Sequence, residues 1–172
     1  MRTWLMAILL MLGGCSASLE DYQGTAPPLR LETFFQGPLV ARGVFQDYSG
    51  KVIRRFTVKL QGQWRDGVGT LDEHFTYADG KTQHRLWTLK ALGGGRYSGK
   101  ASDVVGEAQG RAVGMAFEWH YRMQLKLDDG SEMEVGFEDW MYQLDDKHLL
   151  NRSVMKKFGL AVGEVTLFFE KR

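Results

Sequence analysis

Apolar and polar residues alternate one by one along much of the chain after Pro38. The longest example covers residues 113–127, where every second residue is apolar and the residues between them are polar from Glu118 onward. A repeat of two is that of a β-strand with one buried and one exposed face, whereas a helix repeats every 3.6 residues. The pattern therefore predicts a strand with its buried side formed by Val113, Met115, Phe117, Trp119, Tyr121, Met123, Leu125 and Leu127.

Turn sequences that contain glycine separate the strand-like runs. Asp-Gly and Gly-Gly pairs supply the positive φ angles that tight hairpins require. The run 105–127 is long enough to be one bent strand or two. The predicted strands lie near residues 40–48, 51–64, 68–78, 82–92, 95–102, 105–127, 131–144, 147–157 and 161–170.

Short connections between these runs indicate that neighbours in sequence pair as antiparallel strands. Nine or ten such strands would expose unpaired edges in an open sheet, and closure into a barrel removes those edges. We therefore predict an all-β fold, an antiparallel meander of nine to ten strands closed into a barrel, after an N-terminal signal helix. Residues 147–158 also fit a helix by spacing, but Asn151 and Ser153 are poor helix formers, so a strand is favoured.

Composition narrows the class of protein. The 172 residues suffice for one domain, and 22 basic side chains nearly balance 21 acidic ones. This balance argues against the broad basic surface of a nucleic-acid-binding protein. The single cysteine, Cys15, excludes an intramolecular disulfide and a zinc cluster of several cysteines.

The N-terminus has the features of a secretory signal. Arg2 precedes an unbroken apolar stretch, residues 4–12, which is too short for the ~20 residues of a membrane-spanning helix. Leu-Gly-Gly-Cys at residues 12–15 resembles the lipobox of bacterial lipoproteins. The resemblance implies cleavage before Cys15 and acylation of its thiol and new amino group. Two alternatives are cleavage near residues 16–18, which releases a soluble periplasmic protein, and a buried N-terminal helix.

These features predict three segments. Residues 1–14 are a signal peptide, 15–30 an acylated N-terminus and tether, and 31–172 the barrel domain. The tether carries Pro27 and Pro28, and its residues could span at most ~50 Å. Ser16, where some lipoproteins have aspartate, resembles the signal for the outer membrane. We expect the protein on the periplasmic face of that membrane, with the membrane as its partner through the acyl chains.

Several motifs resemble a bacterial family of uncharacterised lipoproteins, domain of unknown function 3833. The resemblance covers essentially the whole mature chain. It implies a calycin-like or lipocalin-like β-barrel, with no established activity and no catalytic residues. The motifs are Asp-Glu-His-Phe-Thr-Tyr-Ala-Asp-Gly (72–80), Arg-Leu-Trp (85–87), Gly-Lys-Ala-Ser-Asp-Val-Val-Gly (99–106), Asp-Trp-Met-Tyr (139–142), Asn-Arg-Ser (151–153) and Lys-Phe-Gly (157–159).

Four charged residues occupy strand faces that are otherwise apolar: Arg54, Glu73, Arg85 and Asp139. If these faces line the barrel, two cations and two carboxylates point inward, at a cost of several kcal/mol each unless they are paired or hydrated. They could fix the headgroup of a ligand at one end of a cavity. Internal ion pairing, or a bulge that turns them to solvent, is the alternative. The predicted apolar wall of the cavity is formed by Trp87, Trp119 and Tyr121.

No catalytic, cofactor or metal motif stands out. The spacings of the four histidines match no metal-ligand motif, so we expect them on the surface. There is no Gly-x-Ser-x-Gly and no phosphate-binding loop. A cysteine nucleophile is also missing, because Cys15 would be acylated. The sequence therefore predicts neither an enzyme nor a cofactor.

Three functions remain to be compared. The first is a non-enzymatic lipoprotein with a barrel that binds a small apolar ligand, such as a fatty acid or phospholipid, because alternating aromatic and methionine residues adapt to acyl chains. The second is a structural or assembly lipoprotein that has a filled barrel and acts through a protein interface. The third is an enzyme acting on lipid, which would need a paired acid and base. The sequence identifies neither a ligand nor a protein partner.

Overall fold

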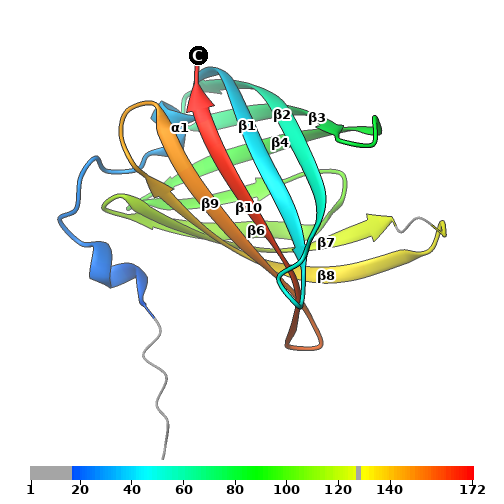
Figure 1. The fold of residues 1–172 in the computed structure, drawn as a ribbon. Helices are drawn as coiled ribbons and strands as arrows, with labels where there is room; N and C mark the ends of the chain where they lie inside the picture. The colour runs from blue at the N-terminus through cyan, green and yellow to red at the C-terminus, as the bar shows by residue number, and fades with distance from the viewer. Residues whose placement is uncertain (1–16, 127–128) are drawn as a thin grey trace, which may run out of the picture.

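The structure, a computed structural model, describes residues 17–126 and 129–172. Ten antiparallel strands form one closed barrel in this part of the chain (Figure 1). The strands are β1 (Gly37–Asp47), β2 (Val52–Arg65), β3 (Val68–Tyr77), β4 (Thr82–Gly93), β5 (Arg96–Lys100), β6 (Val104–Val113), β7 (Ala116–Lys126), β8 (Glu132–Gln143), β9 (His148–Lys157) and β10 (Leu160–Lys171). Each strand pairs with the next, and β1 closes the barrel against β10. The predicted all-β barrel is therefore confirmed.

The structure decides the conformation of two segments for which the sequence allowed alternatives. The run 105–127 contains two strands, β6 and β7, which meet at a turn where Gly114 has φ of 53°. A side chain at Gly114 would also collide with the carbonyl oxygen of Tyr22, so only glycine fits there. The second segment, residues 147–158, contains strand β9, as predicted. Its inward residues alternate and are buried: Leu149, Asn151, Ser153 and Met155.

Two short helical elements precede the barrel: a 3₁₀ helix (Leu19–Tyr22) and α1 (Leu31–Phe34). No helix among the described residues is long and apolar enough to cross a membrane. Cys15 and the signal segment 1–14 lie outside the described residues, as does Leu127 of the predicted strand face.

The segment that contains α1 closes one end of the barrel (Figure 1). The ring of Phe35 packs edge-on against Phe169 of β10, with 5.5 Å between centroids. Gly62 of β2 allows this approach, because any side chain there would collide with the carbonyl of Phe35. The apolar residues that this segment buries are Leu29, Leu31, Phe34 and Phe35, each 3% exposed or less.

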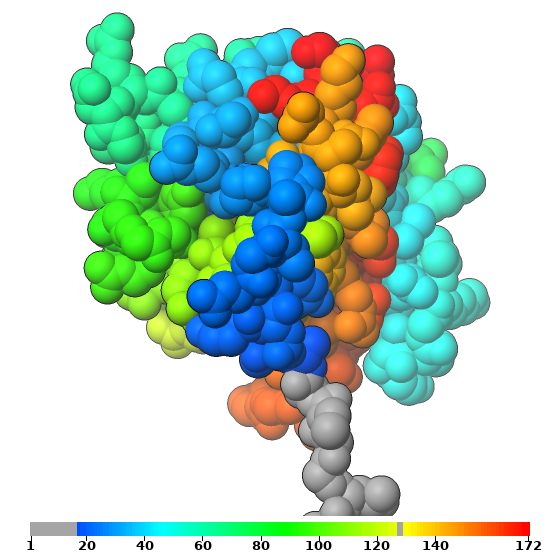
Figure 2. All heavy atoms as spheres, turned by 90° about the vertical axis from the view of Figure 1, so that its left-hand side faces the viewer, coloured from blue at the N-terminus to red at the C-terminus, as the bar shows by residue number. Residues whose placement is uncertain are grey.

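Residues 17–30, the described part of the segment expected to form a tether, lie against the barrel. The ring of Tyr22 contacts those of Trp140 and Tyr142, which point outward from β8. The Thr25 hydroxyl oxygen accepts a hydrogen bond from the Met115 amide at 2.9 Å. Figure 2 shows this segment, in blue, across one face of the molecule. The length that could act as a spacer is therefore shorter than the sequence suggests.

Candidate functional site

Four of the predicted site residues meet inside the barrel, joined by one that was not predicted. Glu73 of β3 and Arg85 of β4 are direct register partners, and both are largely buried. Tyr121 comes from β7 and Asp139 from β8. We call Glu73, Arg85, Asp103, Tyr121 and Asp139 the interior polar cluster.

Arg85 is the cation of this cluster, and two carboxylates flank it. Its Nε lies 2.9 Å and its Nη2 2.8 Å from Oδ2 of Asp103. Its Nη1 lies 3.7 Å from Oε2 of Glu73. The guanidinium also lies over the ring of Phe75, 5.3 Å from the ring centroid, and Nη2 contacts the sulfur of Met123. Arg85 is therefore held by internal partners, so a ligand anion would have to compete with Asp103.

Asp139 is more isolated. Its Oδ2 accepts a hydrogen bond from the Tyr121 hydroxyl at 3.2 Å. Its Oδ1 is buried and has no hydrogen-bond partner among the described residues. Ser153 lies directly opposite on β9, but its hydroxyl donates to Asn151 Oδ1 at 3.1 Å. Such a carboxyl favours the protonated form, because the charged form is poorly solvated.

Burial is the largest influence on the pKa values of the interior polar cluster. Loss of solvation raises the pKa of Glu73 from 4.5 to about 7, although the positive charge of Arg85 opposes the rise. Burial likewise raises the pKa of Asp139 from 3.8 to about 7, although the hydrogen bond from the Tyr121 hydroxyl opposes the rise. Burial also raises the pKa of the Tyr121 phenol. The cluster contains three carboxyl groups for one arginine, and two of the three titrate near neutral pH.

The predicted apolar wall is a packed layer of aromatic rings. Trp87 and Trp119 lie 6.1 Å apart between ring centroids, and both belong to the core that includes α1. Trp87 also meets Tyr121 edge-on at 5.5 Å, and Tyr121 stacks on Phe137 at 5.0 Å. These rings reach one another from β4, β7 and β8, so side chains of the protein itself occupy this level of the barrel.

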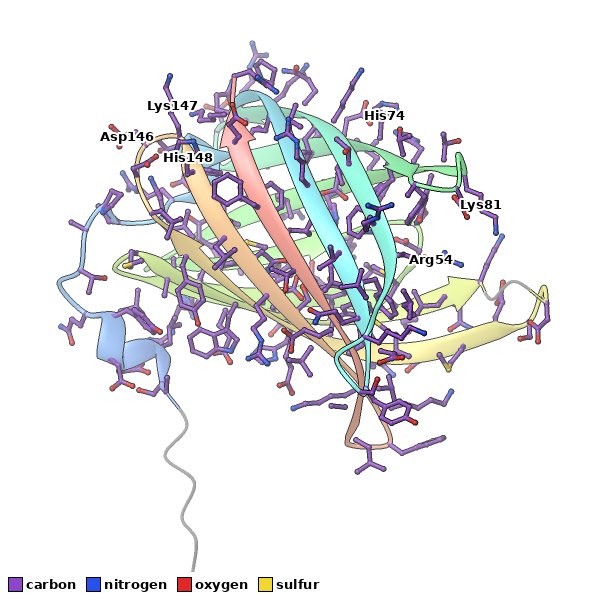
Figure 3. The ribbon with its side chains drawn as sticks, in the orientation of Figure 1. Arg54, His74, Lys81, Asp146, Lys147 and His148 are labelled. Atoms are coloured by element: carbon purple, nitrogen blue, oxygen red, sulfur yellow. The ribbon has the colours of Figure 1, made fainter. Side chains whose placement is uncertain are left out.

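Arg54 is not part of the interior polar cluster. It is exposed at the opposite end of the barrel from α1 (Figure 3). Its guanidinium lies 5.8 Å from the ring centroid of Tyr77. The first residues of β2, 52–55, are all exposed, so this strand extends beyond the buried interior. Arg54 follows the alternation of Phe56 and Val58, but the alternation does not reveal where the strand leaves the core.

Sequence reasoning missed Asp103, Asn151 and Ser153. Asp103 lies in the turn between β5 and β6, where strand periodicity does not define a direction. Asn151 and Ser153 are buried at alternating positions of β9, and Ser153 faces Asp139. Their two-residue spacing was a usable signal once residues 148–157 were taken as a strand.

A separate hollow lies where the register of β6 shifts between Val105 and Gln109. Its volume is about 440 Å³. Its lining includes the charged side chains of Arg122, Glu138 and Lys156. These groups make it a poor site for an apolar ligand.

Comparison with known proteins agrees with the motifs. No protein with curated annotation matches the sequence. A family model with the description "Protein of unknown function (DUF3833)" matches residues 9–171, nearly the whole chain. The chain therefore belongs to the DUF3833 family.

Proposed function

We propose that this protein is a bacterial envelope lipoprotein that holds an apolar, lipid-like ligand in the half of its barrel opposite α1. The observation that carries the proposal is the contrast between the two ends. Most inward apolar side chains near α1 are buried, whereas a set of inward apolar side chains toward the other end is only half-buried. The half-buried set consists of Phe45, Phe56, Phe75, Leu125, Met133 and Val165.

An acyl chain placed against this set would remove apolar surface from water, at about 25 cal/mol per Å². Phe56 and Phe75 lie 5.9 Å apart between centroids and provide a flat aromatic surface. Met133 is an adaptable contact for a flexible chain. The interior polar cluster forms the floor beneath them. The ligand would therefore occupy the open half of the barrel and stop at Arg85.

The headgroup position follows from the charges. Asp103 already forms an ion pair with Arg85, and the three carboxyl groups of the cluster disfavour an added anion. An anionic headgroup, as in a fatty acid or phospholipid, would therefore remain at the rim. There the exposed Arg54 lies beside the Tyr77 ring, and an anion would add to the contacts that Arg54 already makes within the protein. Guanidinium groups bind carboxylate and phosphate well.

Exposed apolar residues at two neighbouring hairpins support a membrane location. Tyr48 is 85% and Phe158 94% exposed, at the β1–β2 and β9–β10 turns. Leu160 is 72% exposed, and Lys157 Nζ lies 5.4 Å from the Phe158 ring centroid. Aromatic and apolar residues beside cations are typical of contact with a lipid surface. Such contact would allow a lipid to pass between membrane and barrel.

A structural or assembly lipoprotein is the second candidate. It is favoured by the packed aromatic layer of Trp87, Trp119 and Tyr121, which fills the middle of the barrel. If side chains also fill the open half in solution, the protein would act through its outer surface. Ligand binding distinguishes the two candidates.

Replacing Phe56 with tryptophan provides a reporter inside the proposed site. Titration of the full-length protein, in detergent, with a brominated fatty acid is expected to quench the Phe56→Trp fluorescence saturably, because bromine quenches a nearby indole. The expected stoichiometry is one ligand per chain. Fluorescence is read as the difference from the unaltered protein, which removes the signal of the native tryptophans.

Phe168→Trp is the matched control, since Phe168 is an aromatic residue of β10 that is 38% exposed on the outer face. It should show only the weak, unsaturated quenching caused by ligand in the micelle. Equal quenching of both variants, or none of Phe56→Trp, would reject the ligand and favour the structural role.

The anchoring predicted at Cys15 has its own test. Cys15→Ser is expected to abolish acylation and to leave the unprocessed precursor, because the thiol that receives the lipid is lost. Mass spectrometry of the whole protein measures both effects. The Ser18→Ala protein, which carries a nearby substitution of similar size, should be acylated normally. A Cys15→Ser protein with the mass and membrane partition of the parent would contradict the lipoprotein assignment.

A further inference from the structure

Three side chains that commonly bind metals meet on the outer face of β3 and β4, separate from the interior polar cluster. Asp72 and His74 lie two residues apart on β3 and therefore share a face. His84 is the register partner of His74 on β4. We infer that Asp72, His74 and His84 form a binding site for a divalent transition-metal ion such as Zn²⁺.

Both imidazoles point at the same carboxylate oxygen. Asp72 Oδ1 lies 2.6 Å from Nε2 of His84 and 3.2 Å from Nε2 of His74. One ligand atom from each of the three residues lies within 4.8 Å of the others. Ligands at ~2.0–2.1 Å from a tetrahedral Zn²⁺ are about 3.3 Å apart. Small side-chain adjustments would suffice, with the metal replacing the Asp72–His84 hydrogen bond.

The backbone supports this arrangement. His74 and His84 lie within a continuous run of paired residues between β3 and β4. Their rings stack with 4.7 Å between centroids and 26° between planes. Figure 3 shows His74 on the outside of the barrel. The side chains of His74 and His84 are 63% and 56% exposed, so an ion can reach them directly from solution.

The donor set determines the class of metal. Two imidazole nitrogens and one carboxylate suit Zn²⁺, Ni²⁺ and Cu²⁺, whereas Ca²⁺ and Mg²⁺ prefer oxygen ligands. Three protein ligands leave a coordination position for water or another molecule. Lys59, the register partner of His74 on β2, is exposed and can turn its ammonium group away from the ion.

Other histidines provide internal comparisons. Nε2 of His120 lies 3.0 Å from Glu118, and Nδ1 of His148 lies 2.9 Å from Asp145. Each of these pairs contains one imidazole and one carboxylate, without a second histidine. The β3–β4 register alone adds the second imidazole, which explains why linear spacing does not reveal the site.

Calorimetric titration of the full-length protein with ZnCl₂, after treatment with a chelator, tests the site. The unaltered protein is expected to bind one Zn²⁺ per chain saturably, and excess Mg²⁺ should not compete. His84→Ala is expected to weaken binding more than about tenfold, since loss of residues that merely support ligands costs 10–100-fold. His120→Ala, the matched control, should retain the original affinity.

Co²⁺ provides a second readout that requires no variant. Binding to two imidazoles and a carboxylate in a four-coordinate site is expected to give stronger visible absorption than the hydrated ion, and added Zn²⁺ should remove it. Three results would each overturn the inference: no saturable Zn²⁺ binding, equal affinity of the unaltered and His84→Ala proteins, or a Co²⁺ spectrum that the protein does not change.

Discussion

Lowering the pH from about 8 to about 5 is expected to stabilise this protein against unfolding. Glu73 and Asp139 have pKa values near 7 in the folded protein, against 4.5 and 3.8 as ordinary values. Between these limits the folded state therefore binds more protons than the unfolded state. The corresponding stability is complete below the unfolded pKa values and is lost as the pH rises through about 7.

The expected effect is large because both carboxyls are buried. Each pKa unit corresponds to ~1.4 kcal/mol, so shifts of this size amount to on the order of 3 kcal/mol for each group. The two groups also influence each other through their charges, so their contributions are not simply additive. The measurement is the free energy of unfolding by urea at several pH values between about 5 and about 8.

Asp139→Asn isolates the effect. The amide keeps the shape of the carboxyl but cannot ionise, so the variant should show a smaller pH dependence and a relative gain in stability at the alkaline end. Asp47→Asn is the control, because hydrogen bonds from Ser49 and from the Ser49 and Lys51 backbone amides lower the pKa of Asp47, away from this pH range. It should therefore leave the slope unchanged. A wild-type stability that is constant or falls on acidification, or a full slope in Asp139→Asn, would contradict the buried-carboxyl account.

Phe117→Ala is expected to reduce the free energy of unfolding by ~3–5 kcal/mol. Phe117 is 1% exposed and sits within the core that closes the α1 half of the barrel. Its ring contacts Tyr97 edge-on at 5.7 Å and Trp119 at 5.4 Å between centroids. Two large aromatic neighbours cannot move enough to fill the space, so a cavity would remain.

Glu118→Ala, one residue along the same strand, is the comparison. Glu118 points outward and pairs with His120 at 3.0 Å, so its loss should change stability by no more than about 0.5 kcal/mol. Chemical denaturation of both variants measures the difference. Similar losses for the two variants would show that the alternation of β7 does not separate a buried face from an exposed one.

The sequence predicted much of the candidate site because strand geometry is local. Successive side chains of a strand point to opposite faces, so Glu73, Arg85 and Asp139 could be assigned to the interior without knowing which strands pair. The residues that complete the cluster were harder to find. Asp103 comes from a turn, and the orientation of a turn residue depends on the strands on either side.

Which charged residues pair with one another could be seen only in the assembled barrel. From the sequence, Arg85 was as available to a ligand anion as Arg54. In the structure, Asp103 holds Arg85 in the interior, and Arg54 lies exposed beside the Tyr77 ring. The same holds for Asp72, His74 and His84, which share no linear motif and meet through the β3–β4 register.

The sequence by itself determined most of the strands, their inward faces and the position of most turns, although it left the turn between β6 and β7 open. These depend on side-chain alternation and on glycines with positive φ, which act within a few residues. Only the tertiary structure decided how the barrel closes and which end is sealed. Closure pairs Leu39 with Lys171, and the seal places Phe35 against Phe169. Such contacts depend on the tilt and stagger of all ten strands together, which no local pattern specifies.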